Sequence, residues 1–470
     1  MSFIAPRTSL IASLSLLATA TAMAEPLALD DRLELFADEF LVGEMKGDLE
    51  RHLFQPEPRD VVFTADADWE GNTSGYYTLF QDGDLYRMIY RGWAHDPTTM
   101  KQIRSEVTCY AESDDGITWR KPELGLFDFE GSKANNIIVR SGNGIHNFTA
   151  FKDTRPDCPP EERYKALGGS KEKGKHGLMY FRSADCVHWE QVGDEPVITD
   201  GAFDSQNLAF YDSVRGEYRA YWRIFTNKVR AIRTATSKDF ITWEPHHDLE
   251  YPEGTPNQHL YTNAIQPYAR ASHLFIGFPT RYLPDEGQRV EPIFMLSRNG
   301  VNFRRFNDPV VPESAPADRK GNRSNYMTWG MLQLPGEPDQ ISVYATEAYY
   351  GPVPGRVRRF VYRLDGFVSL RGGEEGGELL TKPVTFSGNH LTINYATLAK
   401  GGSVTVELAD ADGAPIKGFS LAEAEPLTGD SVKATVSWKG GHDLSELAGQ
   451  PIRVRFLLKQ ADLFSMRFSK

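Results

Sequence analysis

The chain has 470 residues, and its 64 Asp and Glu against 52 Lys and Arg give a formal net charge of −12. This acidic balance argues against a general nucleic-acid role, because phosphate neutralisation needs clustered Lys and Arg, although it leaves room for a local basic pocket. Cys109, Cys158 and Cys186 cannot make a disulfide framework in so long a chain, and no Cys/His spacing resembles a zinc site. We therefore expect stability to come from core burial, with no metal and no other cofactor.

Residues 1–24 have the pattern of a secretory signal peptide. Arg7 precedes an apolar run over 10–20, and Ala22-Met23-Ala24 gives the small-x-small pattern that signal peptidase reads. The run is too short to span a bilayer, and no later stretch approaches the roughly 18 apolar residues of a membrane helix. We therefore expect an exported protein, periplasmic or extracellular, without an integral membrane segment.

A motif of the form S-x-D-x-x-x-W recurs through the middle of the chain. Ser and Asp of such a motif form a turn by bonding nearby backbone, and the aromatic residue then packs between adjacent sheets. Successive copies begin 70, 54, 60 and 66 residues apart, somewhat more than a four-stranded blade needs, which is typical of a β-propeller with loop insertions. The copies are Ser113–Trp119, Ser183–Trp189, Ser237–Trp243, the weaker Ser297–Phe303 and the degenerate Arg363–Ser369.

A second repeat runs in phase with the first, because each unit opens with a strand that carries an Asn near its start. Inner strand, hairpin, second strand and motif hairpin make four strands per blade. We therefore predict an all-β fold with a five-bladed β-propeller over residues 25–371, in which the segment Leu33 to Val42 supplies the strand that closes the ring. The repeated residues are Asn72, Asn147, Asn207, Asn263 and Asn325.

The C-terminal part has a different pattern. The Gly-rich, charged run Arg371–Gly377 predicts a linker. Beyond it, short alternating runs separated by turns predict a β-sandwich over residues 372–470. These runs are 391–395, 403–408, 432–438 and 452–456.

In a propeller, the starts of inner strands, the ends of second strands and the starts of third strands meet at one mouth of the central channel. Glu70, Asp204 and Glu347 fall at such positions in the first, third and fifth units, with Glu106 as a fourth candidate carboxylate. Glycosidic bond cleavage needs one carboxylic acid to protonate the leaving oxygen and a second carboxylate as nucleophile or base. The competing interpretation is that each carboxylate pairs with a neighbouring Arg. The other candidates at this mouth, expected to bind substrate, are Asn72, Arg91, His146, Asn147, Gln206, Asn207, Arg223, His259, Asn263, Arg281 and Arg323.

Four of these candidates are arginines, whose planar fork suits carboxylate, sulfate or phosphate. Their presence near one channel of an acidic protein indicates an anionic group on the substrate. Alternatively, they pair with the candidate carboxylates and set the pKa values of those groups. The sequence leaves both interpretations open.

These repeats, with the acidic residues that open the first and third units, resemble the five-bladed propeller glycosidases of glycoside hydrolase families 32, 43, 68 and 117. The resemblance covers most of the mature chain, including a C-terminal sandwich of the kind that family 32 carries. It implies a catalytic Asp in the first blade, a transition-state-stabilising Asp in mid-propeller and a Glu acid in a later blade. Glu70 and Asp204 are similar in position to the first two.

The chain departs from family 32, since it has no N-D-P-N-G, R-D-P or E-C motif and offers Glu70 where that family has Asp. It therefore looks like a divergent group, to which fructan specificity does not extend. The resemblance implies a glycoside hydrolase acting on a poly- or oligosaccharide, and the signal-peptide pattern of residues 1–24 predicts that it is exported. The alternatives are a non-catalytic glycan-binding propeller and a glycoside phosphorylase, in which basic residues hold phosphate.

Overall fold

The computed structural model describes residues 25–170, 172–311 and 325–470. The expected signal peptide, 1–24, and the candidate Arg323 lie outside the described residues. The described chain is almost entirely β, and its helical segments are two short 3-10 turns, η1 (Pro160–Glu162) and η3 (Ser445–Leu447). In the described ranges, no helix has the length and apolar character needed to cross a membrane.

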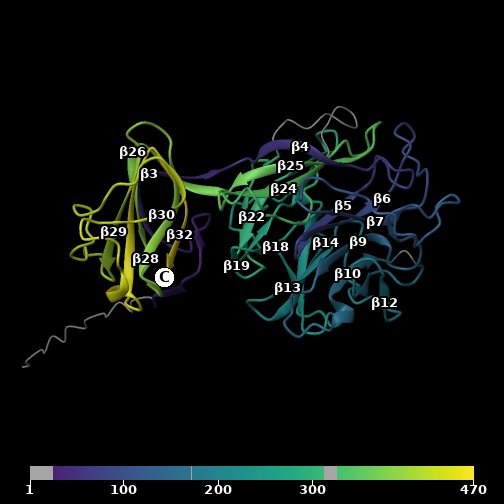
Figure 1. Cartoon of the computed structure of the whole chain (residues 1–470), viewed down its shortest axis with the longest axis horizontal. Coiled ribbons are helices and arrows are strands. Elements are labelled where there is room, and N and C mark those ends of the chain that lie inside the picture. Colours follow the sequence, from purple (N-terminus) through teal and green to yellow (C-terminus); the bar gives the residue numbers. More distant parts are fainter. Residues whose placement is uncertain (1–24, 171, 312–324) are drawn as a thin grey trace, which may run out of the picture.

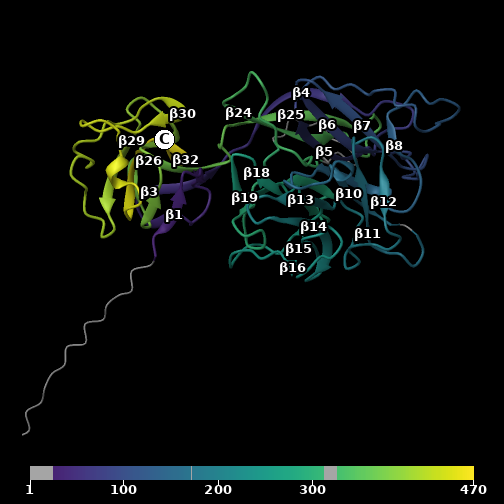
Figure 2. The same ribbon diagram turned by 60° about the horizontal axis from the view of Figure 1, so that its bottom comes forward.

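Between residues 57 and 363 the chain forms small antiparallel sheets joined by turns and loops (Figures 1 and 2). The first sheet contains β5 (Gly75–Asp82), β6 (Leu85–Gly92), β7 (Val107–Ser113) and β8 (Ile137–Val139). The second contains β9 (His146–Lys152), β10 (Tyr164–Gly169), β11 (Leu178–Ser183) and β12 (Glu190–Val192). The third contains β13 (Leu208–Asp212), β14 (Glu217–Thr226), β15 (Val229–Ser237) and β16 (His247–Asp248).

Three further small sheets follow. The fourth contains β18 (Gln266–Tyr268), β19 (Ala271–Gly277), β22 (Phe294–Ser297) and β23 (Phe303–Phe306). Beside it lies a three-stranded ribbon of β17 (His259–Leu260), β20 (Thr280–Leu283) and β21 (Arg289–Pro292). The fifth sheet contains β24 (Gln340–Glu347), β25 (Arg356–Arg363) and β4 (Glu57–Thr64).

First strands of successive sheets lie side by side. β9 contacts both β5 and β13, and the Asn263 amide donates to the backbone oxygen of Gln206 at 3.3 Å. Trp329, in the stretch that precedes β24, accepts a backbone hydrogen bond from Leu79 at 2.8 Å and donates one to Tyr77 at 3.0 Å. The last sheet therefore meets the first, although about 250 residues separate them in the chain.

The repeated motif forms one turn four times over. Ser113 Oγ accepts the N–H groups of Asp115 and Gly116 at 3.2 and 2.9 Å. Asp115 Oδ1 accepts those of Ile117 and Thr118 at 2.8 and 2.7 Å. The same bonds recur in the copies that begin at residues 183, 237 and 297, the last with Asn in place of Asp. In the degenerate fifth copy, the Asp365 carboxylate pairs instead with Arg270 at 2.9 Å.

The expectation that Leu33 to Val42 pairs with the small sheets is wrong. Within that segment, β2 (Glu34–Leu35) pairs with β32 of the C-terminal sheet, whereas β4 pairs with β25. The physical reason is burial, because Phe63 of β4 packs on Tyr90 with ring centroids 5.0 Å apart in the core of the first and fifth sheets.

The C-terminal sheet network has ten strands and includes the N-terminal ones. The run Arg371–Gly377, which we expected as a linker, lies instead inside one long strand paired with β3, with a shift of register between Gly372 and Gly377. Gly376 there has φ +76°, a conformation that Gly adopts at no steric cost. The strands are β1 (Leu27–Asp30), β2, β3 (Val42–Leu53), β26 (Val368–Thr381), β27 (Val384–Phe386), β28 (His390–Thr397), β29 (Ser403–Asp410), β30 (Asp430–Thr435), β31 (Ile452–Lys459) and β32 (Ala461–Ser469).

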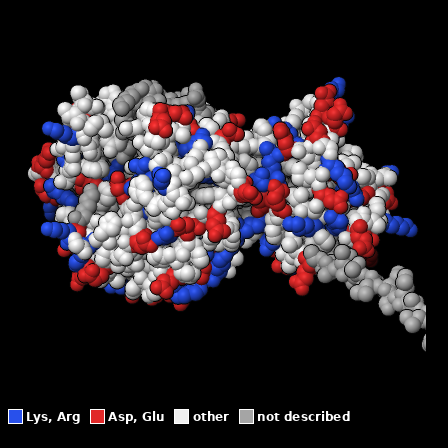
Figure 3. All heavy atoms as spheres, turned by 180° about the vertical axis from the view of Figure 1, so that it is seen from behind, with Lys and Arg blue, Asp and Glu red and all other residues white. Residues whose placement is uncertain are grey.

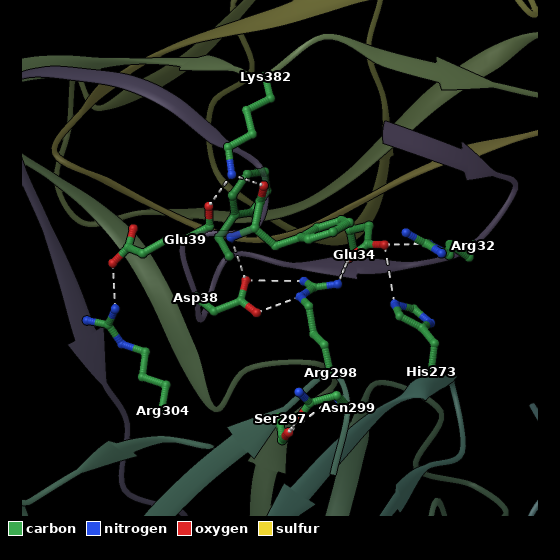
Figure 4. A network of polar contacts seen from close by, with 12 residues as sticks. Arg32, Glu34, Asp38, Glu39, His273, Ser297, Arg298, Asn299, Arg304 and Lys382 are labelled. Atoms are coloured by element: carbon green, nitrogen blue, oxygen red, sulfur yellow. Dashed lines mark hydrogen bonds and ion pairs between the residues drawn. The ribbon is translucent and has the colours of Figure 1, made fainter. Parts of the chain in front are cut away.

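A polar network joins the C-terminal sheet to the fourth small sheet (Figure 4). Arg298, in the turn of the fourth motif, donates to Glu34 at 2.8 Å and to Asp38 at 2.6 Å. Glu34 is fully buried and also accepts from Arg32 at 2.6 Å. Burial raises the pKa of Glu34, but the contacts with His273, Arg298 and Arg32 outweigh it and lower that pKa. Glu34 is therefore held as a buried carboxylate with cationic partners.

Charges on the outside are mixed in sign. On the face seen in Figure 3, acidic and basic side chains intermingle over both parts of the molecule. This surface lacks the broad basic stripe that a nucleic-acid partner requires.

Candidate active site

Side chains from the first and third sheets, from the three-stranded ribbon and from the segments beside the fifth sheet meet around a pocket of about 250 Å³. Among the residues that the structure describes, six tyrosines line it, with two arginines and a single carboxylate, that of Asp204. A larger cavity of about 510 Å³, beside Phe54 and Asp430, contains none of the predicted site residues. The residues that line the smaller pocket are Tyr76, Arg91, Trp93, Asp204, Arg230, Tyr261, Tyr282, Gln288, Val290, Tyr326, Tyr349 and Tyr350.

His146 links two of the candidate carboxylates. It is the first residue of β9, Glu106 directly precedes β7, and Asp204 lies in the loop before β13. His146 Nδ1 lies 2.9 and 3.0 Å from the two oxygens of Glu106, and Nε2 lies 3.3 Å from Asp204 Oδ1. The proton on Nδ1 therefore belongs in the bond to Glu106, and Nε2 faces the pocket acid.

A second hydrogen bond to His146 comes from Asn147. Arg91 Nη1 donates to Asn147 Oδ1 at 2.7 Å, which fixes the orientation of that amide and directs Nδ2 to His146 Nε2 at 3.1 Å. The amide thus donates to Nε2 when His146 is neutral, whereas Asp204 accepts from Nε2 when His146 is protonated. Because each protonation state has a partner, His146 can gain and lose a proton at Nε2 without leaving its place.

Asp204 is the accessible member of this chain of contacts, since 65% of its side chain is exposed. The hydrogen bond from His146 lowers the pKa of Asp204 well below its usual range, and the positive charges of Arg223 and Arg91 add to this effect. Asp204 is therefore ionised throughout the physiological pH range, as a nucleophile or base must be.

The other predicted carboxylates do not line the pocket. Glu70 is fully buried, accepts from Lys121 Nζ at 2.6 Å and is hydrogen-bonded to the Tyr90 hydroxyl. Glu347 is also buried and pairs with Arg358 at 2.6 Å and with Arg356 at 3.0 Å. Of the four candidates, the structure thus brings together Asp204 and Glu106, while a catalytic role for the other two stays a prediction.

Three of the predicted amides, unlike Asn147, donate their hydrogen bonds to backbone oxygens. Asn72 donates to the oxygens of His95 and Gly351 at 2.9 and 2.8 Å, and Gln206 donates to Tyr77 at 3.0 Å. Asn207 donates to the oxygens of Phe203 and Ser205 at 2.9 and 3.0 Å. The Asn repeat therefore fixes the strand starts at which the site residues sit.

The predicted arginines have different surroundings. Arg281 pairs with Glu291 at 3.0 Å and so has a structural partner. Arg91 is 3% exposed, lines the pocket and donates to Tyr349 at 2.7 Å. Arg223 is 5% exposed, donates to the Ala202 oxygen at 2.9 Å and lies 4.9 Å from the centre of the Tyr261 ring.

Sequence reasoning missed Arg230 and the tyrosines. Arg230 lines the pocket from the start of β15, and its backbone N–H donates to His259 Nδ1 at 3.0 Å. Its position, at the start of a third strand, is the one that singled out Glu106 in the first unit. That signal was therefore present in the sequence, whereas nothing in the spacing marked the tyrosines. In the part of the chain that the structure describes, no cluster of three or more His, Cys, Asp or Glu is arranged to hold a metal ion.

No family model matches the chain, and no curated protein matches it. Three solved structures show its similarity to known proteins. A β-1,2-mannobiose phosphorylase from Listeria innocua is 11% identical, with a TM-score of 0.46 over 68% of this chain and 97% of the phosphorylase. A family 43 arabinoxylan arabinofuranohydrolase from Bacillus subtilis is 9% identical, with a TM-score of 0.42 over 86% and 96%. An N-acetylgalactosamine deacetylase from F. plautii is 13% identical, with a TM-score of 0.43 over 67% and 95%. At these identities and TM-scores, no activity and no site residue carries over to this chain.

Proposed function

We propose that this protein is an exported glycoside hydrolase that cleaves a glycosidic bond at the pocket around Asp204. In this proposal the five small sheets are the blades of a five-bladed propeller, and the C-terminal strands form a β-sandwich. The contacts of β9 with β5 and β13, and of Trp329 with β5, support the ring. The observation that carries the activity is the Glu106–His146–Asp204 chain, which ends in the pocket.

The proposed roles of Asp204 and His146 follow from the ionised state of the Asp204 carboxylate and from the proton that His146 can carry at Nε2. Asp204, held ionised, accepts a proton from water as the water oxygen bonds to the anomeric carbon and the bond from that carbon to the leaving oxygen breaks. Alternatively, Asp204 itself bonds to the anomeric carbon as that bond breaks, and water then hydrolyses the glycosyl ester and frees the carboxylate. His146, held by Glu106 through Nδ1, gives its Nε2 proton to the leaving glycosidic oxygen. The 3.3 Å contact between His146 and Asp204 is longer than an ideal N–H···O bond, so the leaving oxygen can compete for that proton.

The lining of the pocket fits a sugar. Tyr261, Tyr326 and Tyr349 pack edge to face, with ring centroids 5.8 and 5.3 Å apart, and so form a rigid aromatic wall. Aromatic walls with a few fixed polar groups are typical of small-ligand sites, and tyrosine combines an apolar ring with a polar tip.

One observation favours a second candidate, a glycoside phosphorylase. Arg91 and Arg230 line the pocket, and guanidinium groups bind phosphate oxygens in the same fork geometry as carboxylates. A phosphorylase would release a sugar phosphate only when inorganic phosphate is present, whereas a hydrolase releases free sugar in its absence.

The test is release of reducing sugar from a panel of poly- and oligosaccharides by the mature chain, with and without phosphate. We expect Asp204→Asn and His146→Gln each to reduce the rate by about a hundredfold or more. Asp200→Asn is the matched control, because Asp200 pairs with Arg233 and does not line the pocket. Equal rates for the two site variants and the control would contradict the assignment, and binding without turnover would indicate a glycan-binding protein instead.

A further inference from the structure

Three guanidinium groups around the pocket form no ion pair with any Asp or Glu of the described ranges. Arg91 and Arg230 line it, and Arg223 lies against its Tyr261 wall. Within the described residues, no Asp or Glu lies within ion-pairing distance of any of the three. By contrast, Arg281, Arg356 and Arg358 all pair with carboxylates, namely those of Glu291 and Glu347.

Part of the hydrogen-bonding capacity of these arginines is also unused. Arg91 Nε, Arg223 Nη1 and Arg230 Nε are buried without a hydrogen-bond partner in the described chain. Leaving buried charged donors unpaired is unfavourable, and such groups recur where a ligand completes the contacts. These donors, which no described residue pairs, are therefore available to an acceptor that a ligand brings.

Aromatic rings hold the Arg230 guanidinium in place. It lies 4.7 Å from the centre of the Tyr282 ring and 5.1 Å from that of Tyr261, both of which line the pocket. Burial, and then the charge of Arg230, lower the pKa of His259, so this imidazole accepts the Arg230 N–H as a neutral group. A guanidinium stacked in this way is oriented before a ligand arrives.

The charge balance of the pocket points the same way. Asp204 is the one carboxylate among the described lining residues, against the positive charges of Arg91, Arg230 and the adjacent Arg223. With Glu106 behind His146 as a second carboxylate, a neutral glycan would leave three guanidinium charges against two carboxylates, whereas an oxyanion would balance the excess charge and occupy free donors.

We infer that the substrate is an anionic glycan whose carboxylate or sulfate oxygens bind Arg230, with Arg91 and Arg223 contributing positive charge next to the bond that is cleaved. The position of that bond rests on the proposed function, but recognition of the anion does not. Arg230 is the principal contact because it is both pocket-lining and only partly buried, while Arg91 is already engaged with Asn147, Thr73 and Tyr349.

The test is calorimetric binding to the full mature chain carrying Asp204→Asn, which prevents turnover. The probes are oligogalacturonate, a glucuronate-containing oligosaccharide and a sulfated galactan oligosaccharide, each beside its carboxyl-reduced or desulfated counterpart. We expect at least one acidic probe to bind about ten- to hundredfold more tightly than its neutral counterpart, as charge-assisted hydrogen bonds imply. The pair of acidic and neutral probes that shows this difference in affinity identifies the recognised anion as a carboxylate or a sulfate.

Variants on β15 locate the contact. Arg230→Gln removes the preference for the acidic probe, and Arg230→Lys retains part of it because it keeps the charge without the fork. Arg233→Gln, on the same strand, leaves the preference unchanged, since Arg233 pairs with Asp248 at 2.6 Å outside the pocket. Circular dichroism of each variant checks that the fold is intact.

Equal affinity for acidic and neutral probes, no binding of any acidic probe, or an unchanged preference in a folded Arg230→Gln would each overturn the inference. Selective binding of an acidic probe that the wild-type chain does not hydrolyse would uphold the inference and contradict the proposed hydrolase. Hydrolysis of acidic and neutral glycans at equal rates and with equal affinity would uphold the proposed hydrolase and contradict the inference of an anionic substrate.

Discussion

The turn around Asp115 determines how much one copy of the repeat contributes to stability. Its carboxylate accepts the N–H groups of Ile117 and Thr118 and the hydroxyls of Ser113 and Thr118, the last at 3.0 Å. Asp115→Ala removes every one of these acceptors. Both backbone donors are exposed, so water replaces the carboxylate, and we expect a loss of about 1–2 kcal/mol in the free energy of unfolding.

The fourth copy supplies the matched control. Asn299 Oδ1 there accepts the N–H groups of Val301 and Asn302 at 2.9 and 2.8 Å, so an amide can hold the same turn. We therefore expect Asp115→Asn to lower the free energy of unfolding by only about 0.5 kcal/mol, the difference between a charged and a neutral acceptor.

The pH dependence of the free energy of unfolding tests the contribution of the Asp115 charge. Burial raises the pKa of Asp115, but the N–H groups of Thr118 and Ile117 outweigh it and lower that pKa to about 2. The stabilisation is therefore fully present above the pKa of an unfolded Asp, about 3.9, and is lost as the pH falls through about 2. Urea unfolding at pH 7, 4 and 3 should show the gap between wild type and Asp115→Asn narrowing with acidity. An Ala variant as stable as wild type at pH 7, or a gap that widens in acid, would refute this account of the repeat.

Two further predictions concern buried groups away from the pocket. Glu34→Gln should lower the free energy of unfolding by about 3–5 kcal/mol, because it leaves Arg298 and Arg32 without their buried carboxylate partner. Urea unfolding measures this loss. A loss no larger than that of Glu44→Gln, an exposed control, would contradict the prediction. Burial, and then the charge of Asp153, raise the pKa of the Cys158 thiol to about 11, while Cys109 and Cys186 are buried. Iodoacetamide at pH 8 should therefore label the folded chain slowly at all three positions and the urea-unfolded chain rapidly, and fast labelling of the folded chain would show that the thiols are accessible.

The sequence predicted those parts of the fold that depend on local contacts. The turn that Ser113 and Asp115 form closes within six residues, so its pattern is visible in the sequence wherever the turn occurs. β4 could not be assigned in this way, because it pairs with β25 about 290 residues later and its partner is set by the packing of Phe63. The Gly-rich part of β26 has the composition of a linker, because glycine is common both in loops and in strands that carry a bulge.

The candidate site also combines residues that the repeat pattern predicts with contacts that depend on distant parts of the chain. Glu106, His146 and Asp204 were found because strand starts converge in a repeat architecture, and the structure brings all three together. The partners of Glu70 and Glu347 were not predictable in the same way. Lys121 lies 51 residues from Glu70, beyond the third strand of its unit, and Arg356 and Arg358 face Glu347 only because of the register between β24 and β25.

A crystal structure of Asp204→Asn with a bound oligosaccharide from the panel tests the central claim most directly. We expect a sugar ring against Tyr261 and Tyr349, with the oxygen of the scissile bond within hydrogen-bond reach of His146 Nε2. An oligosaccharide bound instead in the larger cavity beside Phe54 and Asp430, with the Asp204 pocket empty, would contradict it.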